Sequence, residues 1–306
     1  MIIDTHVHVF RPTDSKGQPQ KYSPNPTSGE DYVATMDAAG IDRAFLISFS
    51  PDDILADLEA KKLTVEDVKD VMNREYAIEV IRRYPDRFYW FPCHLNPMNA
   101  DYLERTQRNL DLGAAGLKIL PSFFGLLPDD DRLLPLYELA QKYNVSVILD
   151  LSFWYLTKGT TRAGFRDVAP LVKDYADLLS HVEPVVEEFS DVNFQLAHAG
   201  TGDLQETGKF MSRYTNVFAD ISARFPGGED YPFPKGLSAL ESLITLAGVE
   251  RVMFGTDWPH FWQGGKMKEI VRCLAEAATF MTPDERALVL GGNALRFVGQ
   301  VQPGLR

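Results

Sequence analysis

Two histidines one residue apart, His6 and His8, follow the apolar start of the chain. Side chains at positions i and i+2 of a strand point the same way, and their Cα atoms lie about 6–7 Å apart. Two imidazoles in this arrangement can bind one metal ion or contact one substrate oxygen, and neutral imidazole is the commonest protein metal ligand. A chance pair of polar residues is the alternative, and the recurrence of similar residues at later strand ends disfavours it.

Polar residues of this kind also stand where later apolar segments end. His198 and Asp257 each follow an apolar segment and precede a small or turn-forming residue. Burying either of them without a partner would cost several kcal/mol, so we expect both to have one. Lys118, Asp150 and Asp220 occupy similar places. Lys118 could pair with a carboxylate or extend to solvent, and Asp220 is expected to cap a turn.

The elements that must position these residues alternate along the chain. Short apolar segments, most of them rich in β-branched residues, predict strands, and amphipathic segments between them predict helices. The expected strands are Ile2–Thr5, Arg43–Ser48, Phe88–Leu95, Ala115–Leu120, Val145–Leu151, Asn193–Ala197, Val217–Ile221 and Arg251–Gly255. The expected helices are Asp31–Ala39, Glu66–Tyr84, Leu103–Leu112, Leu133–Tyr143, Leu178–Phe189, Leu237–Ala247, Met267–Phe280 and one that begins after Thr282.

Eight strand–helix units predict a parallel sheet that closes into a (β/α)8 TIM barrel. The 306 residues suit a single barrel domain over residues 1–306 with long loops after some strands. No glycine-rich phosphate loop follows the first strand, which disfavours a nucleotide-binding fold.

The bulk composition narrows the class of partner. Hydrophobic residues make up 45% of the chain and charged residues 24%, which is ordinary for a globular protein. The net charge of −12 disfavours binding to nucleic acid or to an anionic membrane. We therefore expect a small-molecule substrate, and a homodimer is the default assembly.

Cysteine usage and the N-terminus predict a cytoplasmic protein. Cys93 and Cys273 lie far apart in apolar surroundings, so neither a disulfide framework nor a zinc–cysteine site is expected. The N-terminus lacks the pattern of a signal peptide, and no apolar run is long enough to cross a membrane.

Three long connections leave the ends of expected strands: Phe10–Glu30, Ser152–Ala176 and Ser222–Lys235. Barrel enzymes build their active sites from such loops. A guanidinium can hold a carboxylate through paired hydrogen bonds, so a substrate carboxylate is one possibility. The substrate-binding candidates are Arg224, which is favoured by its place after the seventh strand, with Lys118, Trp154, Arg166 and also Arg162. His94 and His260 are interpreted as core or loop histidines.

The ordered set of motifs resembles the amidohydrolase-related branch of the amidohydrolase superfamily. The matching segments are His6-x-His8, Ala197-His198-Ala199-Gly200, Gly255-Thr256-Asp257-Trp258-Pro259 and Gly291-Gly292-Asn293-Ala294-Leu295-Arg296. That branch includes aminocarboxymuconate-semialdehyde decarboxylase and pyrone-dicarboxylate lactonase. The resemblance implies a (β/α)8 barrel and, in most members, one divalent metal. It implies His6, His8 and Asp257 as metal ligands and His198 as a catalytic histidine beside the metal.

One position departs from the pattern of the decarboxylases. Asp150 stands where they have a histidine on the fifth strand. An aspartate can bind Zn²⁺ or Mn²⁺ through oxygen, so Asp150 could be the fourth ligand of a site that holds one of these ions. A metal-free site, like that of the lactonase, is the other possibility. Carboxylation of Lys118 to bridge two metals is disfavoured by the same departure.

The resemblance and the residues together predict a hydrolase that acts on a small ester, lactone or amide and is metal-dependent, with Asp257 as general base. His198 is the second candidate for that role. Two alternatives stay open. One is non-oxidative decarboxylation of an aromatic or unsaturated carboxylic acid in the same pocket. The other is a barrel that binds a ligand without catalysis, because a fold alone does not prove activity.

Overall fold

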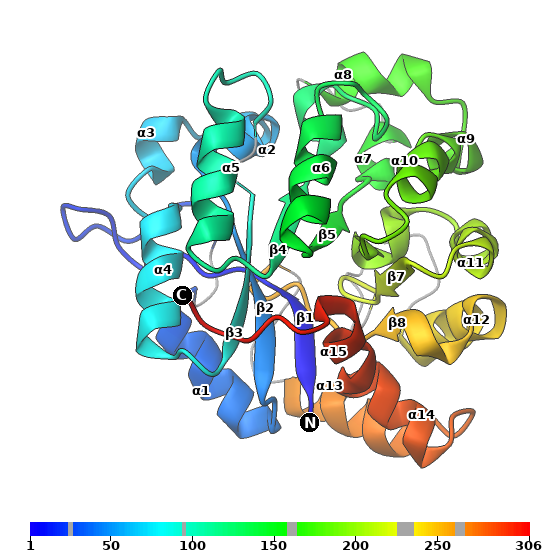
Figure 1. Cartoon of the computed structure of the whole chain (residues 1–306). Helices are drawn as coiled ribbons and strands as arrows, with labels where there is room; N and C mark the ends of the chain where they lie inside the picture. The colour runs from blue at the N-terminus through cyan, green and yellow to red at the C-terminus, as the bar shows by residue number, and fades with distance from the viewer. Residues whose placement is uncertain (24–26, 94–95, 158–163, 225–235, 261–266) are drawn as a thin grey trace.

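A ring of eight parallel strands forms the centre of the molecule, as seen in a computed structural model that describes residues 1–23, 27–93, 96–157, 164–224, 236–260 and 267–306 (Figure 1). The strands pair in chain order as a group of three and a group of five. They are β1 (Ile3–Val7), β2 (Arg43–Ser48), β3 (Phe88–Pro92), β4 (Gly116–Ile119), β5 (Ser146–Leu149), β6 (Phe194–Leu196), β7 (Val217–Asp220) and β8 (Val252–Met253).

Backbone hydrogen bonds join the two groups into a closed barrel. Ala115 N donates to Trp90 O at 2.7 Å between β3 and the start of β4. On the other side, Thr5 N donates to Phe254 O at 3.0 Å, and Val7 bridges Trp258 in parallel. The prediction of a (β/α)8 barrel is confirmed, and each expected strand overlaps an observed one.

Helices surround this ring and bury their apolar faces against the outer sides of the strands (Figure 1). The α-helices are α1 (Gly29–Ala39), α2 (Leu55–Ala60), α3 (Val65–Val68), α4 (Arg74–Arg83), α5 (Tyr102–Asp111), α6 (Leu134–Tyr143), α7 (Phe153–Thr157), α8 (Phe165–Val168), α9 (Tyr175–Ser180), α10 (Glu183–Glu188), α11 (Leu204–Arg213), α12 (Gly236–Ala247), α13 (Met267–Arg272), α14 (Pro283–Ala287) and α15 (Asn293–Val298). Short connecting segments join or extend them. They are the 3₁₀ helices η1 (Pro51–Ile54), η2 (Pro121–Phe124), η3 (Ala169–Leu171), η4 (Ala197–Thr201) and η5 (Val249–Arg251) and the π-helical segments η6 (Cys273–Ala277) and η7 (Leu288–Gly292).

Two expected helices were wrong as continuous elements. The segment Glu66–Tyr84 divides into α3 and α4, because the Asn73 side chain accepts a hydrogen bond from Tyr76 N and begins a new helix. The segment Leu178–Phe189 divides into α9 and α10, where Pro184 lacks the N–H that a continuing helix needs. Helix α11 was not predicted at all. Of the Ser152–Ala176 connection, the described part holds α7 and α8, whose aromatic rings pack on their neighbours.

The inside of the barrel is closed at the N-terminal ends of the strands. Phe297 from α15 lies against the rings of Phe45, Phe91 and Phe218, at centroid distances of 5.9, 6.2 and 5.3 Å. Aromatic contacts of this kind add to the stabilisation from burial. The polar side chains must therefore gather at the opposite, C-terminal end. Among the described residues, no helix has the length and apolar character to cross a membrane.

Candidate active site at the carboxyl ends of the strands

The residues that sequence reasoning selected at strand ends meet inside the barrel. His8 Nε2 lies 3.2 Å from Asp257 Oδ1, although the two residues are far apart in the chain. His6 Nε2 lies 3.8 Å from the same oxygen. Lys118, Asp150 and His198 join the cluster from other strands. All members are buried: His6, His8, Lys118, Asp150, His198, Asp220 and Asp257.

A β-bulge in β1 directs the two N-terminal histidines inward. Asp4 pairs with Ala44 and Val7 pairs with Leu46, so β1 has one residue more than β2 over this stretch. The extra residue changes which side chains face the interior, and bulges are frequent beside active sites for this reason. His6 and His8 both reach the site as a result, while Val7 packs into the outer layer.

Hydrogen bonds of the ring nitrogens define the tautomers of His6 and His8. His8 Nδ1 lies 3.1 Å from the carbonyl of Ile47, which can only accept, so this nitrogen carries the proton. His6 Nδ1 lies 3.4 Å from Asp220 Oδ2, and its Nε2 lies 3.0 Å from the Lys118 ammonium, which can only donate. Both histidines therefore present an unprotonated Nε2 toward Asp257. Burial is the main cause that lowers the pKa of His8 to about 4 and that of His6 well below its usual value.

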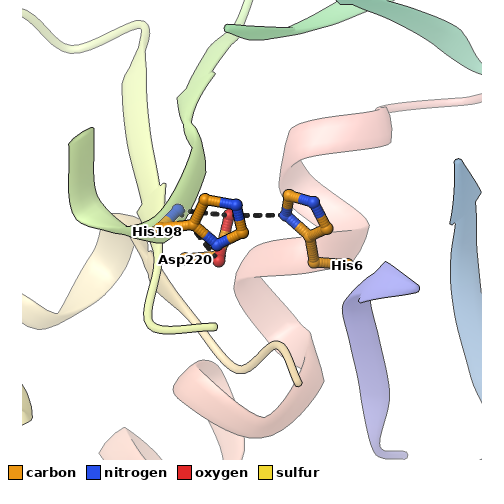
Figure 2. A group of neighbouring side chains, drawn as sticks. All are labelled: His6, His198 and Asp220. Carbon is orange, nitrogen blue, oxygen red and sulfur yellow. Dashed lines mark hydrogen bonds and ion pairs between the residues drawn. The ribbon is translucent and has the colours of Figure 1, made fainter. Parts of the chain in front are cut away.

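Asp220 holds a second histidine as well (Figure 2). Its carboxylate accepts from Gln195 Nε2 at 2.5 Å, from His198 N at 3.3 Å, and from the amide and hydroxyl of Ser222. Because the Ser222 hydroxyl donates to Asp220, it must accept from His198 Nδ1, which lies 2.8 Å from Ser222 Oγ. His198 Nε2 is then the nitrogen free to accept a proton.

Sequence reasoning assigned Asp220 only a turn-capping role and did not select Gln195 or Ser222. Asp220 does cap the turn, since Ser222 N donates to its Oδ1 at 2.9 Å, but its other oxygen reaches His6. The sequence indication for this second role was the place of Asp220 at a strand end. Gln195 had one indication of its own, namely an amide within an otherwise apolar strand.

Lys118 and Asp150 form a buried ion pair beside the histidines. Lys118 Nζ lies 3.1 Å from Asp150 Oδ2, and Asp150 Oδ1 accepts from the amide and hydroxyl of Ser152. Burial alone would raise the pKa of Asp150, but Lys118, His198 and Ser152 together bring it below its usual value. Lys118 Nζ thus contacts both Asp150 and His6, whose Nε2 lies 3.0 Å away.

Asp257 sits in a left-handed backbone conformation, with φ of 58°, after β8. Its amide donates to the His6 carbonyl at 2.8 Å, which ties the loop to β1. Burial would raise the pKa of Asp257, but His198, His8 and His6 outweigh it and lower the pKa well below the usual range. Asp257 is therefore an anion at neutral pH.

The loop that carries Asp257 is held by Asp4, which sequence reasoning did not select. Asp4 accepts from Thr256 N at 2.9 Å and Thr256 Oγ1 at 2.6 Å, and from the Tyr32 hydroxyl at 2.8 Å. Burial raises the pKa of Asp4 to about 7, in spite of these hydrogen bonds. The sequence feature that could have identified Asp4 is its place near the start of an apolar strand, where a carboxylate needs hydrogen-bond partners.

The predicted substrate-binding residues lie in different places. Arg224 is fully buried and donates to the carbonyls of His198 and Gly202 at 2.9 and 2.6 Å, so it supports the turn that carries His198. Arg166 is exposed on α8, and Trp154 is half-buried on α7. Arg162 and His94 lie outside the described residues.

An aromatic wall surrounds His8 and was also not foreseen. The ring of Phe49 stacks on His8 at a centroid distance of 4.6 Å, and the His260 ring lies 5.2 Å away. Phe10 and Tyr22 continue the wall beyond His260, at 5.8 and 5.7 Å from its ring. Such rings exclude water from the histidine and strengthen the electrostatic interactions around it.

Two groups of side chains have the donor types and spacing to hold a metal ion. The first is His6, His8 and Asp257, and the second is His6, His198 and Asp220. In the second group the Asp220 oxygens already accept protein hydrogen bonds. In the first, His8 Nε2 and Asp257 Oδ1 are both acceptors and face each other at 3.2 Å, an arrangement that a cation would satisfy. The first group therefore fits a divalent ion, with the Lys118 ammonium as a competitor for His6 Nε2.

A family model described as "Amidohydrolase" matches residues 3–300 of the chain. A search of curated proteins finds no significant match. Solved structures with the same fold are similar over nearly the whole chain, but at identities low enough that the likeness concerns the fold alone.

Three of these structures show which kinds of protein share the fold. A "probable 2-pyrone-4,6-dicarboxylic acid hydrolase" from Acinetobacter baumannii with bound citric acid is 16% identical, with a TM-score of 0.62 over 97% of this chain and 99% of that one. The 5-carboxyvanillate decarboxylase of Sphingomonas paucimobilis is 16% identical, with a TM-score of 0.62 over 97% and 98%. An amidohydrolase from Burkholderia multivorans with bound zinc is 14% identical, with a TM-score of 0.63 over 97% and 99%.

Proposed function

Because this chain belongs to the amidohydrolase family, we propose that it is an enzyme that hydrolyses a small ester, lactone or amide with Asp257 as the general base. One observation carries the proposal: Asp257 is a buried carboxylate whose Oδ1 lies 3.2 Å from His8 Nε2 and 3.8 Å from His6 Nε2, in surroundings that lower its pKa. A base must be in its proton-accepting form at the working pH, and this environment supplies that form.

Different residues of the site would accept the proton and supply the positive charge that hydrolysis needs. Asp257 accepts the proton of the attacking water, and His198 Nε2 is the second acceptor, with its Nδ1 proton held on Ser222. The Lys118 ammonium, oriented by Asp150, supplies positive charge where a carbonyl oxygen becomes an anion. The buried surroundings strengthen this interaction because they exclude water.

A divalent metal, Zn²⁺ or Mn²⁺, would be held by His6, His8 and Asp257. Such an ion lowers the pKa of a bound water and polarises a carbonyl. The Ile47 carbonyl and the Asp220 carboxylate hold the Nδ1 protons of the two histidines, which is the usual support for metal-binding imidazoles. Asp150 was the fourth candidate ligand, and its pairing with Lys118 supports an electrostatic role for it instead. In the metal-free alternative, Lys118 is the cation of the site.

Decarboxylation is the second candidate, since the amidohydrolase fold also serves a decarboxylase. Protonation of a substrate carbon would need a proton on Asp257, whose pKa is held low. This favours hydrolysis.

The test is turnover of a substrate panel by the purified protein, with metal content measured before and after chelation. The panel contains lactones, aryl esters and amides in one arm and aromatic carboxylic acids in the other. We expect hydrolysis in the first arm and a fall of about 10²- to 10⁴-fold in kcat for Asp257→Asn. Asp191→Asn is the matched control, because Asp191 is exposed at a distance from the barrel interior.

The other outcomes each contradict a definite part of the proposal. Carbon dioxide release in the second arm alone would make the enzyme a decarboxylase. Turnover that survives chelation, with no Zn²⁺ or Mn²⁺ in the protein, would establish the metal-free route. Binding of panel compounds without turnover by the wild type would indicate a non-catalytic barrel.

A further inference from the structure

A cavity lies outside the barrel, between the end of β2 and the helices α4 and α5. Its volume is about 390 Å³, which is in the range of small-molecule sites. It is separate from the cluster around Asp257, because its lining shares no residue with that cluster. The lining consists of Ser50, Asn73, Arg74, Glu75, Arg105, Arg108 and Asn109.

The cavity concentrates positive charge in a chain whose net charge is −12. Arg74, Arg105 and Arg108 line it, against one acidic lining residue, Glu75. Their carboxylate partners are Glu75, Asp101 and Glu104, whose side chains are 68%, 56% and 72% exposed. Ion pairs with such exposed carboxylates contribute little, about 0–1 kcal/mol, so a bound anion can replace them.

Two of the lining side chains hold buried donors without a protein partner. Asn109 is only 1% exposed, and its Nδ2 has no hydrogen-bond acceptor. Arg105 Nη2 is also a buried atom without an acceptor, although the Arg105 side chain as a whole is 23% exposed. Buried donors are nearly always paired in folded proteins, so these two side chains have hydrogen-bonding capacity beside the cavity that the protein itself does not use.

Arg74 is held in place before any ligand arrives. Its Nε donates to Asn109 Oδ1 at 2.5 Å, and its guanidinium lies 5.7 Å from the centre of the Trp90 ring. Trp90 is itself fixed, since its indole N–H donates to Ser48 Oγ at 2.8 Å. A guanidinium fixed in this way loses little freedom on binding, which favours recognition of an oxyanion.

We propose that this cavity is a binding site for a small multivalent anion, either a polycarboxylate or a phosphate compound. Arg74, Arg105 and Arg108 would contact its oxygens, and the Asn109 amide would supply a neutral donor. The inference does not depend on the reaction proposed for the barrel, and it concerns a different ligand site.

The test is isothermal titration of citrate and of inorganic phosphate into the full-length protein. We expect saturable binding of at least one of them, and Arg105→Gln should weaken it by about tenfold or more, because a charge-assisted donor is lost. Arg83→Gln is the matched control, as Arg83 lies on α4 with a side chain that is 64% exposed. Binding should be unchanged in Arg83→Gln and in Asp257→Asn, which reports on the barrel centre.

If circular dichroism shows that Arg105→Gln is unfolded, the binding of the two anions is measured with Arg108→Gln instead. Preference for citrate or for phosphate would identify which oxyanion chemistry the cavity serves. Three results would overturn the proposal: no saturable binding of either anion, equal binding by wild type and both cavity variants, or loss of binding in Asp257→Asn.

Discussion

A single carboxylate controls the proton positions of two histidines in the site. Asp220 accepts from His6 directly and from His198 through the Ser222 hydroxyl. Both imidazoles then carry their proton on Nδ1 and leave Nε2 toward the other polar groups of the site. A histidine in the wrong tautomer cannot accept a proton or bind a metal at Nε2, so the role of Asp220 is to position rather than to react.

Replacing this carboxylate should therefore disturb both rings. In Asp220→Asn an amide N–H can face the histidines, which favours the other tautomer, and we expect kcat to fall by roughly 10²- to 10⁴-fold. The direct measurement is the ¹⁵N chemical shift of the histidine side chains, which reports which nitrogen holds the proton. Ser222→Ala is the matched variant and should change His198 alone. Unaltered ¹⁵N shifts of His6 and His198 in Asp220→Asn would exclude the positioning role.

At the scale of elements, the site depends on how closely the strands approach inside the barrel. Gly116 in β4 pairs with Ser146 in β5, and a Cβ at this glycine would overlap the Ser146 carbonyl oxygen and the Phe91 ring. Neither the carbonyl oxygen nor the ring is the free end of a flexible side chain, so neither can move aside easily. Lys118 lies two residues further along the same strand and reaches His6. The packing at Gly116 thus supports the position of Lys118.

We expect Gly116→Ala to lower the free energy of unfolding by about 1–3 kcal/mol, because overfilled cores must shift their backbone. Urea denaturation would measure this. Gly292→Ala is the control, since the nearest atom there is the flexible Leu288 Cδ2 at 3.1 Å and the residue is helical. It should change stability by no more than about 1 kcal/mol. Equal effects at the two glycines would contradict the close strand approach.

At the scale of the whole molecule, the buried site couples stability to pH in two opposite ways. Burial lowers the pKa of His8 from 6.5 to about 4, so the unfolded chain takes up this proton first and stability falls as the pH drops from 6.5 to 4. Burial raises the pKa of Asp4 from 3.8 to about 7, so its contribution is present at low pH and is lost as the pH rises from 3.8 to 7.

Two variants should separate these contributions in chelator-treated protein. Relative to wild type, His8→Gln should become more stable as the pH falls from 6.5 to 4, by a change on the order of 3 kcal/mol. Asp4→Asn should become relatively more stable as the pH rises from 4 to 7. Urea unfolding at a series of pH values measures both. Parallel curves for wild type and His8→Gln would show that His8 is not held neutral by the fold.

Much of the architecture could be predicted from local patterns. The apolar pattern of a strand indicates that the strand is buried. When eight such short strands alternate with helices, a closed parallel barrel is one of the few folds that can bury all of them. His6, His8, His198 and Asp257 could be selected because a polar side chain at the end of an apolar strand needs a partner. The divided helices show the limit of periodicity, since Asn73 and Pro184 break a pattern that the apolar residues alone would continue.

The sequence by itself determined the barrel and the types of residue at its mouth; the tertiary structure alone decided which of them touch. Asp150 pairs with Lys118, Arg224 is enclosed beneath the His198 turn, and Asp220 reaches His6. The first two contacts depend on the pairing of neighbouring strands, and the third, between residues 214 positions apart, depends on ring closure and on the β1 bulge. Local sequence carries no information on such distances, because propensity and periodicity act over a few residues only.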